Sequence, residues 1–312
     1  MPDRLRRIAA AAALPLTAVF GLLVAPAQAQ QALPTPVAPV AAPAPEVAHP
    51  ALWKVSDADT TIYLFGTIHA LPEGIDWFGG PVATAFEGSD ELVTEIVQSS
   101  PESMQSVVLA KAIQPPGQAL RAQLSKSDRA AFDKAMMGFG LPVTAFDRFK
   151  PWYAAIALAT LPIVQGGFAS DQGVEAVLDA RAKALSRSHS ALETAEFQLG
   201  LFDSLPPAVQ CKYLREVIDD LPSIRTELET IVGEWKQGHA DRLAELMNED
   251  EDDPAMIATL ITNRNRTWSE WIRKRLDTPG TVFVAVGAGH LAGKDSVQDF
   301  LAKAGVQSAR VQ

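Results

Sequence analysis

The sequence predicts an α/β or α+β fold with a central mixed sheet, surrounding helices and a large helical insert. Short β-prone segments without charged residues lie near both ends of the folded region, at 60–65 and 281–286. The chain between them has the length and the three-to-four-residue apolar spacing of helices. Apolar strands of this kind are typical of a sheet that helices cover on both faces.

The N-terminal segment 1–29 is predicted to be a secretory signal peptide. It combines three arginines at its start, an apolar run over 8–24 and a small-x-small cleavage site that ends at Ala29. We expect cleavage near Ala29 and a periplasmic or secreted bacterial protein with no stable membrane span. A protein that remains anchored to the membrane by an uncleaved N-terminus is the alternative.

Residues 30–50 consist mostly of alanine, proline and valine. Repeated proline removes backbone donors and favours an extended polyproline II chain, so this segment is predicted to be a linker. The folded domain is then expected over 51–312.

Composition narrows the class of protein. The chain of 312 residues has 27 Lys and Arg against 37 Asp and Glu, which gives a formal net charge of −10. An acidic protein repels the phosphates of nucleic acid, so we expect no nucleic-acid partner. The single cysteine, Cys211, excludes an internal disulfide and a zinc cluster built on cysteines.

The elements of the folded domain follow from apolar patterning and from glycine and proline positions. Strands are predicted, in chain order, at 60–65, 91–97, 190–193, 281–286 and 306–311. Helices are predicted at 101–112, 125–137, 145–161, 171–184, 206–236 and 256–276. The helical insert thus covers about 101–275.

Two segments far apart in the chain share one pattern, a strand followed by Gly-x-x-His. The first ends in Gly66 and His69, and the second ends in Gly287 and His290. Glycine allows a sharp turn as the strand leaves the sheet, and ligands gather at the carboxyl ends of strands in open α/β sheets. We therefore expect the two imidazoles to meet, where they can bind a divalent metal ion. Histidines that only bond to nearby carbonyl groups are the alternative.

Two charged residues stand at positions that should be buried. Glu95 lies inside the apolar segment 91–97, and Arg264 interrupts the apolar stripe of the helix at 256–276. Because an unpaired buried carboxylate costs several kcal/mol, Glu95 needs a cation, a metal ion or a proton. We expect Arg264 to pair with Glu95 or with Glu193, and Asn265 to hold a ligand or a loop. A structural ion pair for Glu95 and an Arg264 that extends to solvent remain alternatives.

The sequence also resembles a known family. It carries GTIHAL at 66–71, TEIV around Glu95, FKPW at 149–152, ALETAEFQLGLFDSLP at 191–206, TNRN at 262–265 and VGAGHL at 286–291. These motifs, in this order, are similar to those of the TraB/GumN family, and the resemblance spans essentially all of 51–312. The family is in turn similar to the Tiki proteins, which are described as metal-dependent proteases with two GxxH motifs and a glutamate.

The resemblance implies a metal site formed by His69, His290 and Glu95, with Glu193, Arg264 and Asn265 at further recurrent positions. It also implies an architecture like that of erythromycin esterase and ChaN. The leading hypothesis is an exported metal-dependent hydrolase, specifically a peptidase, with a divalent ion as cofactor and a peptide or protein as substrate.

Two other functions stay open. One is a non-catalytic envelope protein that binds a peptide or a polysaccharide-assembly partner, because some family members are associated with xanthan gum gene clusters. The other is metal-free ester hydrolysis with a histidine as the base.

Overall fold

The computed structural model describes residues 46–97, 100–248 and 254–312. The predicted signal peptide and most of the predicted linker lie outside these residues. The last residues assigned to the linker belong to the fold. Strand β1 (Glu46–Val47) pairs in parallel with β4 (Ile75–Asp76), and Ala48 and Pro50 are buried.

The predicted mixed sheet is confirmed as a sheet of six strands in the order β6-β5-β7-β3-β2-β8. Pairs β6–β5, β5–β7 and β7–β3 are parallel, whereas β2 pairs antiparallel with β3 and β8. The strands span Leu52–Ser56 (β2), Thr60–Thr67 (β3), Glu91–Thr94 (β5), Ser188–Ala191 (β6), Gly280–Gly287 (β7) and Ala309–Arg310 (β8).

The early and the late GxxH strands are neighbours. Strand β3 pairs with β7 over their full length, from Thr60 opposite Gly280 to Thr67 opposite Gly287. Strand β5 lies on the other side of β7, and all three run in the same direction. Their carboxyl ends therefore meet at one edge of the sheet, as the shared sequence pattern predicts.

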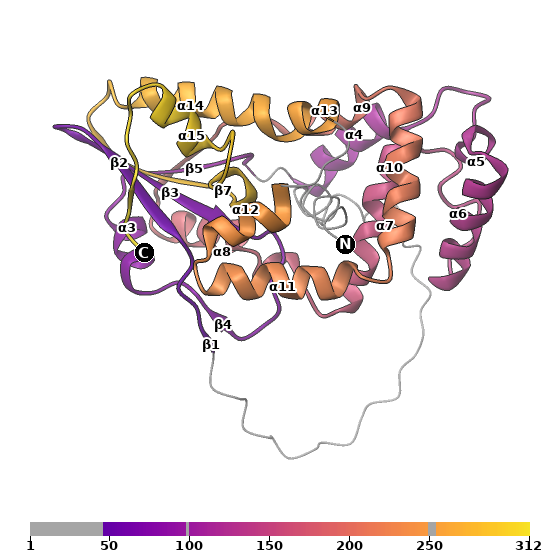
Figure 1. The fold of residues 1–312 in the computed structure, drawn as a ribbon, viewed down its shortest axis with the longest axis horizontal. Coiled ribbons are helices and arrows are strands. Elements are labelled where there is room, and N and C mark those ends of the chain that lie inside the picture. The colour runs from indigo at the N-terminus through magenta and orange to yellow at the C-terminus, as the bar shows by residue number, and fades with distance from the viewer. Residues whose placement is uncertain (1–45, 98–99, 249–253) are drawn as a thin grey trace, which may run out of the picture.

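Helices cover both faces of the sheet, and each face has its own core. On one face, α14 (Asn263–Arg275) and α15 (Val297–Lys303) pack on alternate strand residues such as Leu64, Val93 and Val284. On the other face, Phe65 and Phe283 join a larger aromatic core. This arrangement confirms the prediction of a sheet covered on both sides (Figure 1).

The described residues between β5 and β7 form mainly helices, joined by loops and accompanied by the short strand β6. Its helices are α4 (Pro101–Ala112), α5 (Leu120–Gln123), α6 (Lys126–Gly138), α7 (Pro151–Gln165), α8 (Val174–Ala184), α9 (Ala195–Asp203), α10 (Pro207–Asp220), α11 (Ile224–Lys236), α12 (Ala240–Asn248), α13 (Pro254–Ile257) and α14. Helix α3 (Gly80–Glu87) precedes β5, and short 3₁₀ turns cover Ser170–Gln172 and Ala288–His290. Helices α5 and α6 lie farthest from the sheet (Figure 1).

Two helix predictions need correction. The expected long helix at 206–236 is two helices, α10 and α11, because Pro222 lacks the N–H that a continuous helix would use. The expected helix at 256–276 is interrupted by a π-helical segment, Ala258–Thr262, where Asn263 N–H bonds to Ala258 O five residues back. This segment immediately precedes Arg264.

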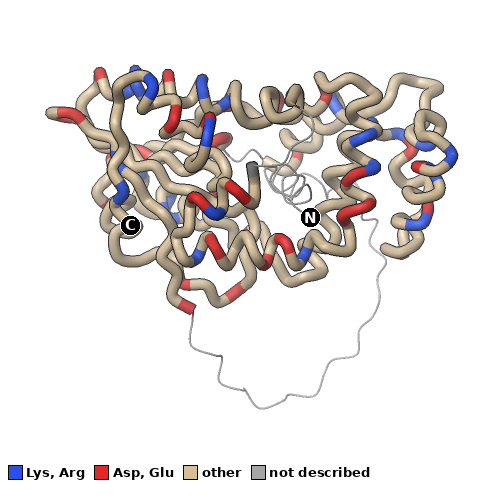
Figure 2. The backbone as a smooth tube through the Cα atoms, in the orientation of Figure 1, with Lys and Arg blue, Asp and Glu red and all other residues tan. Residues whose placement is uncertain are grey.

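Ion pairs connect the peripheral helices to one another. Figure 2 shows acidic and basic residues interspersed along α6 and α10. Arg215 on α10 bonds to Asp219 on the same helix at 2.8 Å and to Asp128 on α6 at 3.3 Å.

In the described part of the chain, none of the helices has both the length and the apolar character that crossing a membrane requires.

Candidate active site

The two GxxH glycines allow close approach between elements at the carboxyl edge of the sheet. A Cβ atom on Gly66 would lie 3.1 Å from Cα and Cβ of Ala288, and one on Gly287 would lie 3.2 Å from Oε1 of Glu95. The sequence predicts that these glycines allow a sharp turn. Neither has a positive φ, so other residues could adopt the same backbone angles. A Cβ atom at either position would require Ala288 or the Glu95 carboxylate to shift by a few tenths of an ångström.

Glu95 lies at the centre of this edge. It directly follows β5 and is 4% exposed. Its Oε1 accepts a hydrogen bond from Gly287 N–H at 2.8 Å, and its Oε2 accepts from Arg264 Nη2 at 2.6 Å and Gln198 Nε2 at 2.9 Å. Burial favours the neutral acid, but Arg264, the nearby histidine rings and the Gly287 amide outweigh it and lower the pKa of Glu95 to about 2. The carboxylate is therefore ionised at neutral pH.

The π-helical segment orients the guanidinium of Arg264. Arg264 is buried at the start of α14, where Nη1 donates to the carbonyl oxygen of Leu260 at 3.1 Å. Single π-turns are frequent at functional sites because they shift side chains from ordinary helical positions. Arg264 thus faces the core, as the interrupted apolar stripe predicts, and does not extend to solvent.

Arg264 pairs with both predicted acids. Besides its bond to Glu95, it donates to Glu193 from Nε and Nη2, each at 2.9 Å. Glu193 lies just beyond β6, and its oxygens also accept from Trp268 Nε1 at 3.0 Å and Gln198 Nε2 at 2.9 Å. Because both oxygens are saturated with donors, Glu193 is suited to hold Arg264 in place.

His290 is held as a neutral imidazole. Its Nδ1 lies 2.6 Å from Oδ1 of Asn265, whose amide donates to Asp295 O at 2.8 Å, so Nδ1 carries the proton. Asn265 therefore holds both the histidine and a loop. Nε2 lies 3.3 Å from Arg264 Nη1. Burial and the positive charge of Arg264 lower the pKa of His290 to about 3.

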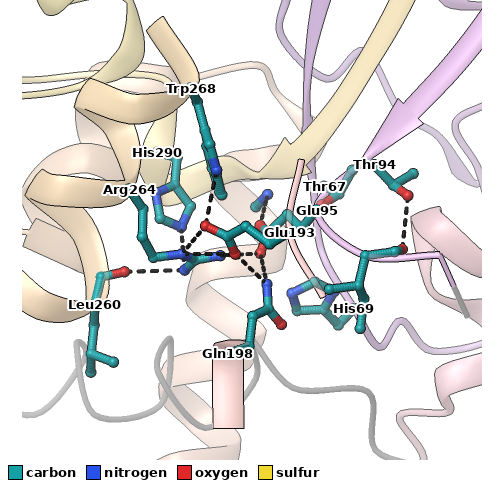
Figure 3. Close-up of polar contacts among 12 residues, drawn as sticks. Thr67, His69, Thr94, Glu95, Glu193, Gln198, Leu260, Arg264, Trp268 and His290 are labelled. Atoms are coloured by element: carbon teal, nitrogen blue, oxygen red, sulfur yellow. Dashed lines mark hydrogen bonds and ion pairs between the residues drawn. The ribbon is translucent and has the colours of Figure 1, made fainter. Parts of the chain in front are cut away.

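His69 lies on the other side of Glu95 from His290 (Figure 3). Its Nδ1 is 2.7 Å from Oε1 of Glu175 on α8. Burial works to lower the pKa of His69, but the charge and hydrogen bond of Glu175 outweigh it, so the pKa is raised. The structure therefore brings His69, His290, Glu95, Glu193, Arg264 and Asn265 to one edge of the sheet.

The expected metal cluster does not appear as three converging ligands. Among residues 46–97, 100–248 and 254–312, no three His, Cys, Asp or Glu side chains are close enough together to hold one ion. The guanidinium of Arg264 contacts Oε2 of Glu95 and Nε2 of His290, and the metal hypothesis assigns both residues as ligands.

Sequence reasoning missed several residues that support the site. Gln198 bridges Glu95 and Glu193, because its Nε2 donates to an oxygen of each. His189 is half-buried, with Nε2 2.8 Å from Thr94 Oγ1 and Nδ1 3.0 Å from Oδ1 of Asp179. No local pattern indicates these partners, because they lie far apart in the chain.

Fold and site together define a mixed α/β protein with a buried histidine, glutamate and arginine cluster at the carboxyl ends of the four parallel strands β3, β5, β6 and β7. The chain belongs to the TraB/PrgY/gumN family, whose sequence model matches residues 51–310. It is also similar to an uncharacterized protein of Treponema pallidum (strain Nichols), with 22% identity over 266 residues that cover 80% of each chain. No solved structure matches the chain.

Replacement of Arg264 by methionine is expected to destabilise the fold strongly. Two buried carboxylates would lose their shared cation, and removal of one partner from a buried ion pair costs about 3–5 kcal/mol. Urea unfolding at pH 7 measures the loss. Arg266→Met is the matched control, because Arg266 is an exposed neighbour on the same helix. A loss below about 1 kcal/mol for Arg264→Met would contradict the role of this guanidinium.

Acid should destabilise the protein partly through His290. The pKa of its ring is about 3 in the folded state, against 6.5 for a histidine exposed to water, so between these pH values the unfolded chain binds the extra proton. Stability therefore falls as pH decreases from about 6.5 towards 3. Unfolding free energies measured across this range should fall less steeply in His290→Gln, while the exposed control His239→Gln follows the wild type. Equal slopes for His290→Gln and wild type would refute the assignment.

Proposed function

We propose that this protein is an exported, metal-dependent hydrolase that cleaves peptide bonds. The observation that carries the proposal is the meeting of two strand-end histidines around one buried, ionised carboxylate, Glu95. Membership of the TraB/PrgY/gumN family is consistent with it. Export rests on the predicted signal peptide, with cleavage near Ala29 and a periplasmic or secreted location.

The donor atoms suit a divalent ion in their chemistry. Each histidine uses Nδ1 to reach an oxygen atom, of Glu175 or of Asn265, so Nε2 is the ring atom that would bind the ion. Metal-binding histidines usually donate the N–H of their other ring nitrogen to an oxygen atom in this way. In His290 the ion would have to displace Nη1 of Arg264, which lies 3.3 Å from Nε2. His69, Glu95 and His290 would hold the ion, which when bound supplies an acidic water and polarises a carbonyl group.

The other side chains of the site would act on the substrate's developing charge. Arg264 is a fixed cation beside Glu95, and a guanidinium in a buried site stabilises an oxyanion more than it would in water. Glu193 and Gln198 would hold that guanidinium in position through their hydrogen bonds. Asn265 would hold His290 in the tautomer that leaves Nε2 unprotonated.

A metal-free hydrolase is the second candidate, and the position of Arg264 favours it. The guanidinium already contacts Glu95 and His290, so a metal ion would compete with it for the same atoms. In this candidate the pair of His69 and Glu175 would activate water as a general base.

A chelator experiment separates the two candidates. Mature protein is incubated with a peptide library, and cleavage is followed by mass spectrometry with and without EDTA. We expect EDTA to abolish cleavage and a single added divalent ion to restore it. His69→Ala and His290→Ala should each lower kcat/KM at least about 10²-fold, as expected for loss of a catalytic group.

The exposed variant His239→Ala is the control and should keep wild-type kinetics. Cleavage that resists EDTA but requires His69 would favour the metal-free hydrolase. A folded protein that neither binds a divalent ion nor hydrolyses peptides or esters would contradict both candidates. That result would leave the non-catalytic envelope protein, in which a His69→Ala/His290→Ala double variant keeps its biological function.

A further inference from the structure

Glu175 makes the closest polar contact to His69 outside the residues that the family motifs suggest. Its Oε1 lies 2.7 Å from Nδ1 of His69, and both side chains are 17% exposed. The hydroxyl of Thr67, the last residue of β3, donates to the same oxygen. Three residues from two distant parts of the chain therefore share one small polar contact beside the site.

The backbone brings Glu175 to this place through an unusually close approach. The N–H of Val174 bonds to Ile68 O at 3.0 Å, and Leu71 and Ala169 exchange two backbone bonds. A Cβ atom on Gly173 would lie 2.1 Å from the carbonyl oxygen of His69, so only glycine fits there. The start of α8 is thus fixed against the end of β3 before any side chain contributes.

The contact fixes the histidine ring in one orientation. A carboxylate accepts hydrogen bonds and cannot donate them when ionised, so Nδ1 of His69 must carry the proton. Within the described residues, no donor reaches the buried Oε2 of Glu175, so the bonds of this carboxylate are concentrated on His69 and Thr67. Nε2 is then the ring atom that faces the site, where Glu95 lies (Figure 3).

We infer that Glu175 is a positioning residue for His69: it holds the ring with Nδ1 protonated and Nε2 turned toward Glu95. The kinetic part of this inference rests on the proposed hydrolase function, whereas the ring geometry does not. His290 has the equivalent support from Asn265, so the two histidines are held in the same way by different residues.

The test replaces the acceptor and follows the ring proton of His69. Glu175→Met removes the acceptor at similar length, and Glu175→Gln keeps an acceptor oxygen. Glu234→Met is the matched control, because Glu234 pairs with Nδ1 of the exposed His239 at the same 2.7 Å. Histidine ring N–H signals are recorded by NMR on ¹⁵N-histidine-labelled full-length mature protein, with kcat and KM measured on the peptide substrate.

A slowly exchanging Nδ1 proton is expected for His69 in wild type, Glu175→Gln and Glu234→Met, and its loss is expected in Glu175→Met. The same variant should lower kcat about 10- to 100-fold with KM within about twofold, as for other residues that orient a catalytic histidine. An Nδ1 proton that persists in Glu175→Met overturns the inference. If Glu175→Met does not fold, absence of the protected proton from wild type and Glu175→Gln overturns it.

These outcomes separate the inference from the proposed function. Loss of the ring proton in a protein without hydrolytic activity supports the positioning role and counts against the hydrolase. Active wild-type enzyme with unchanged kcat and an unchanged ring proton in Glu175→Met supports the hydrolase and removes Glu175 from its machinery.

Discussion

The buried guanidinium of Arg264 is the interaction on which the arrangement of the site depends. A charge removed from water must be paired, and this one is paired with Glu95 and Glu193, which come from the ends of β5 and β6. The same guanidinium contacts His290 beyond the end of β7. Helix α14 therefore holds three strand ends through one side chain, and the π-helical segment before it sets the direction of that side chain.

The pairing with Arg264 also sets the protonation states of Glu95 and His290. The positive charge of Arg264 lowers the pKa of Glu95, and burial together with the same charge lowers the pKa of His290. A carboxylate and a neutral imidazole therefore coexist in a buried space at neutral pH. The proposed hydrolase would use both species, because the neutral ring can accept a proton or a metal ion and the carboxylate supplies negative charge. Close packing makes this possible, since Gly66 and Gly287 let the strand ends approach without intervening side chains.

The sequence predicted the parts of the site that carry a local signal. The repeated strand and GxxH pattern identified β3 and β7 as partners, and two charges at apolar positions identified Glu95 and Arg264. Strand β2 was not predicted, because the polar residues Lys54 and Ser56 interrupt its apolar pattern. Such residues fit there because β2 lies near the edge of the sheet, beside the two-residue strand β8. Glu175, Gln198 and the partners of His189 could not be predicted, because their roles arise from contacts between residues far apart in the chain.

Anomalous diffraction from crystals soaked with manganese or cobalt tests most directly whether these strand ends form one metal-dependent centre. The account predicts a single strong peak about 2.0–2.2 Å from Nε2 of His69, Nε2 of His290 and an oxygen of Glu95. The guanidinium of Arg264 would then be displaced from at least one of the atoms that it contacts in the free protein. Crystals that remain without a peak at this edge, with Arg264 still on Glu95 and His290, would contradict it.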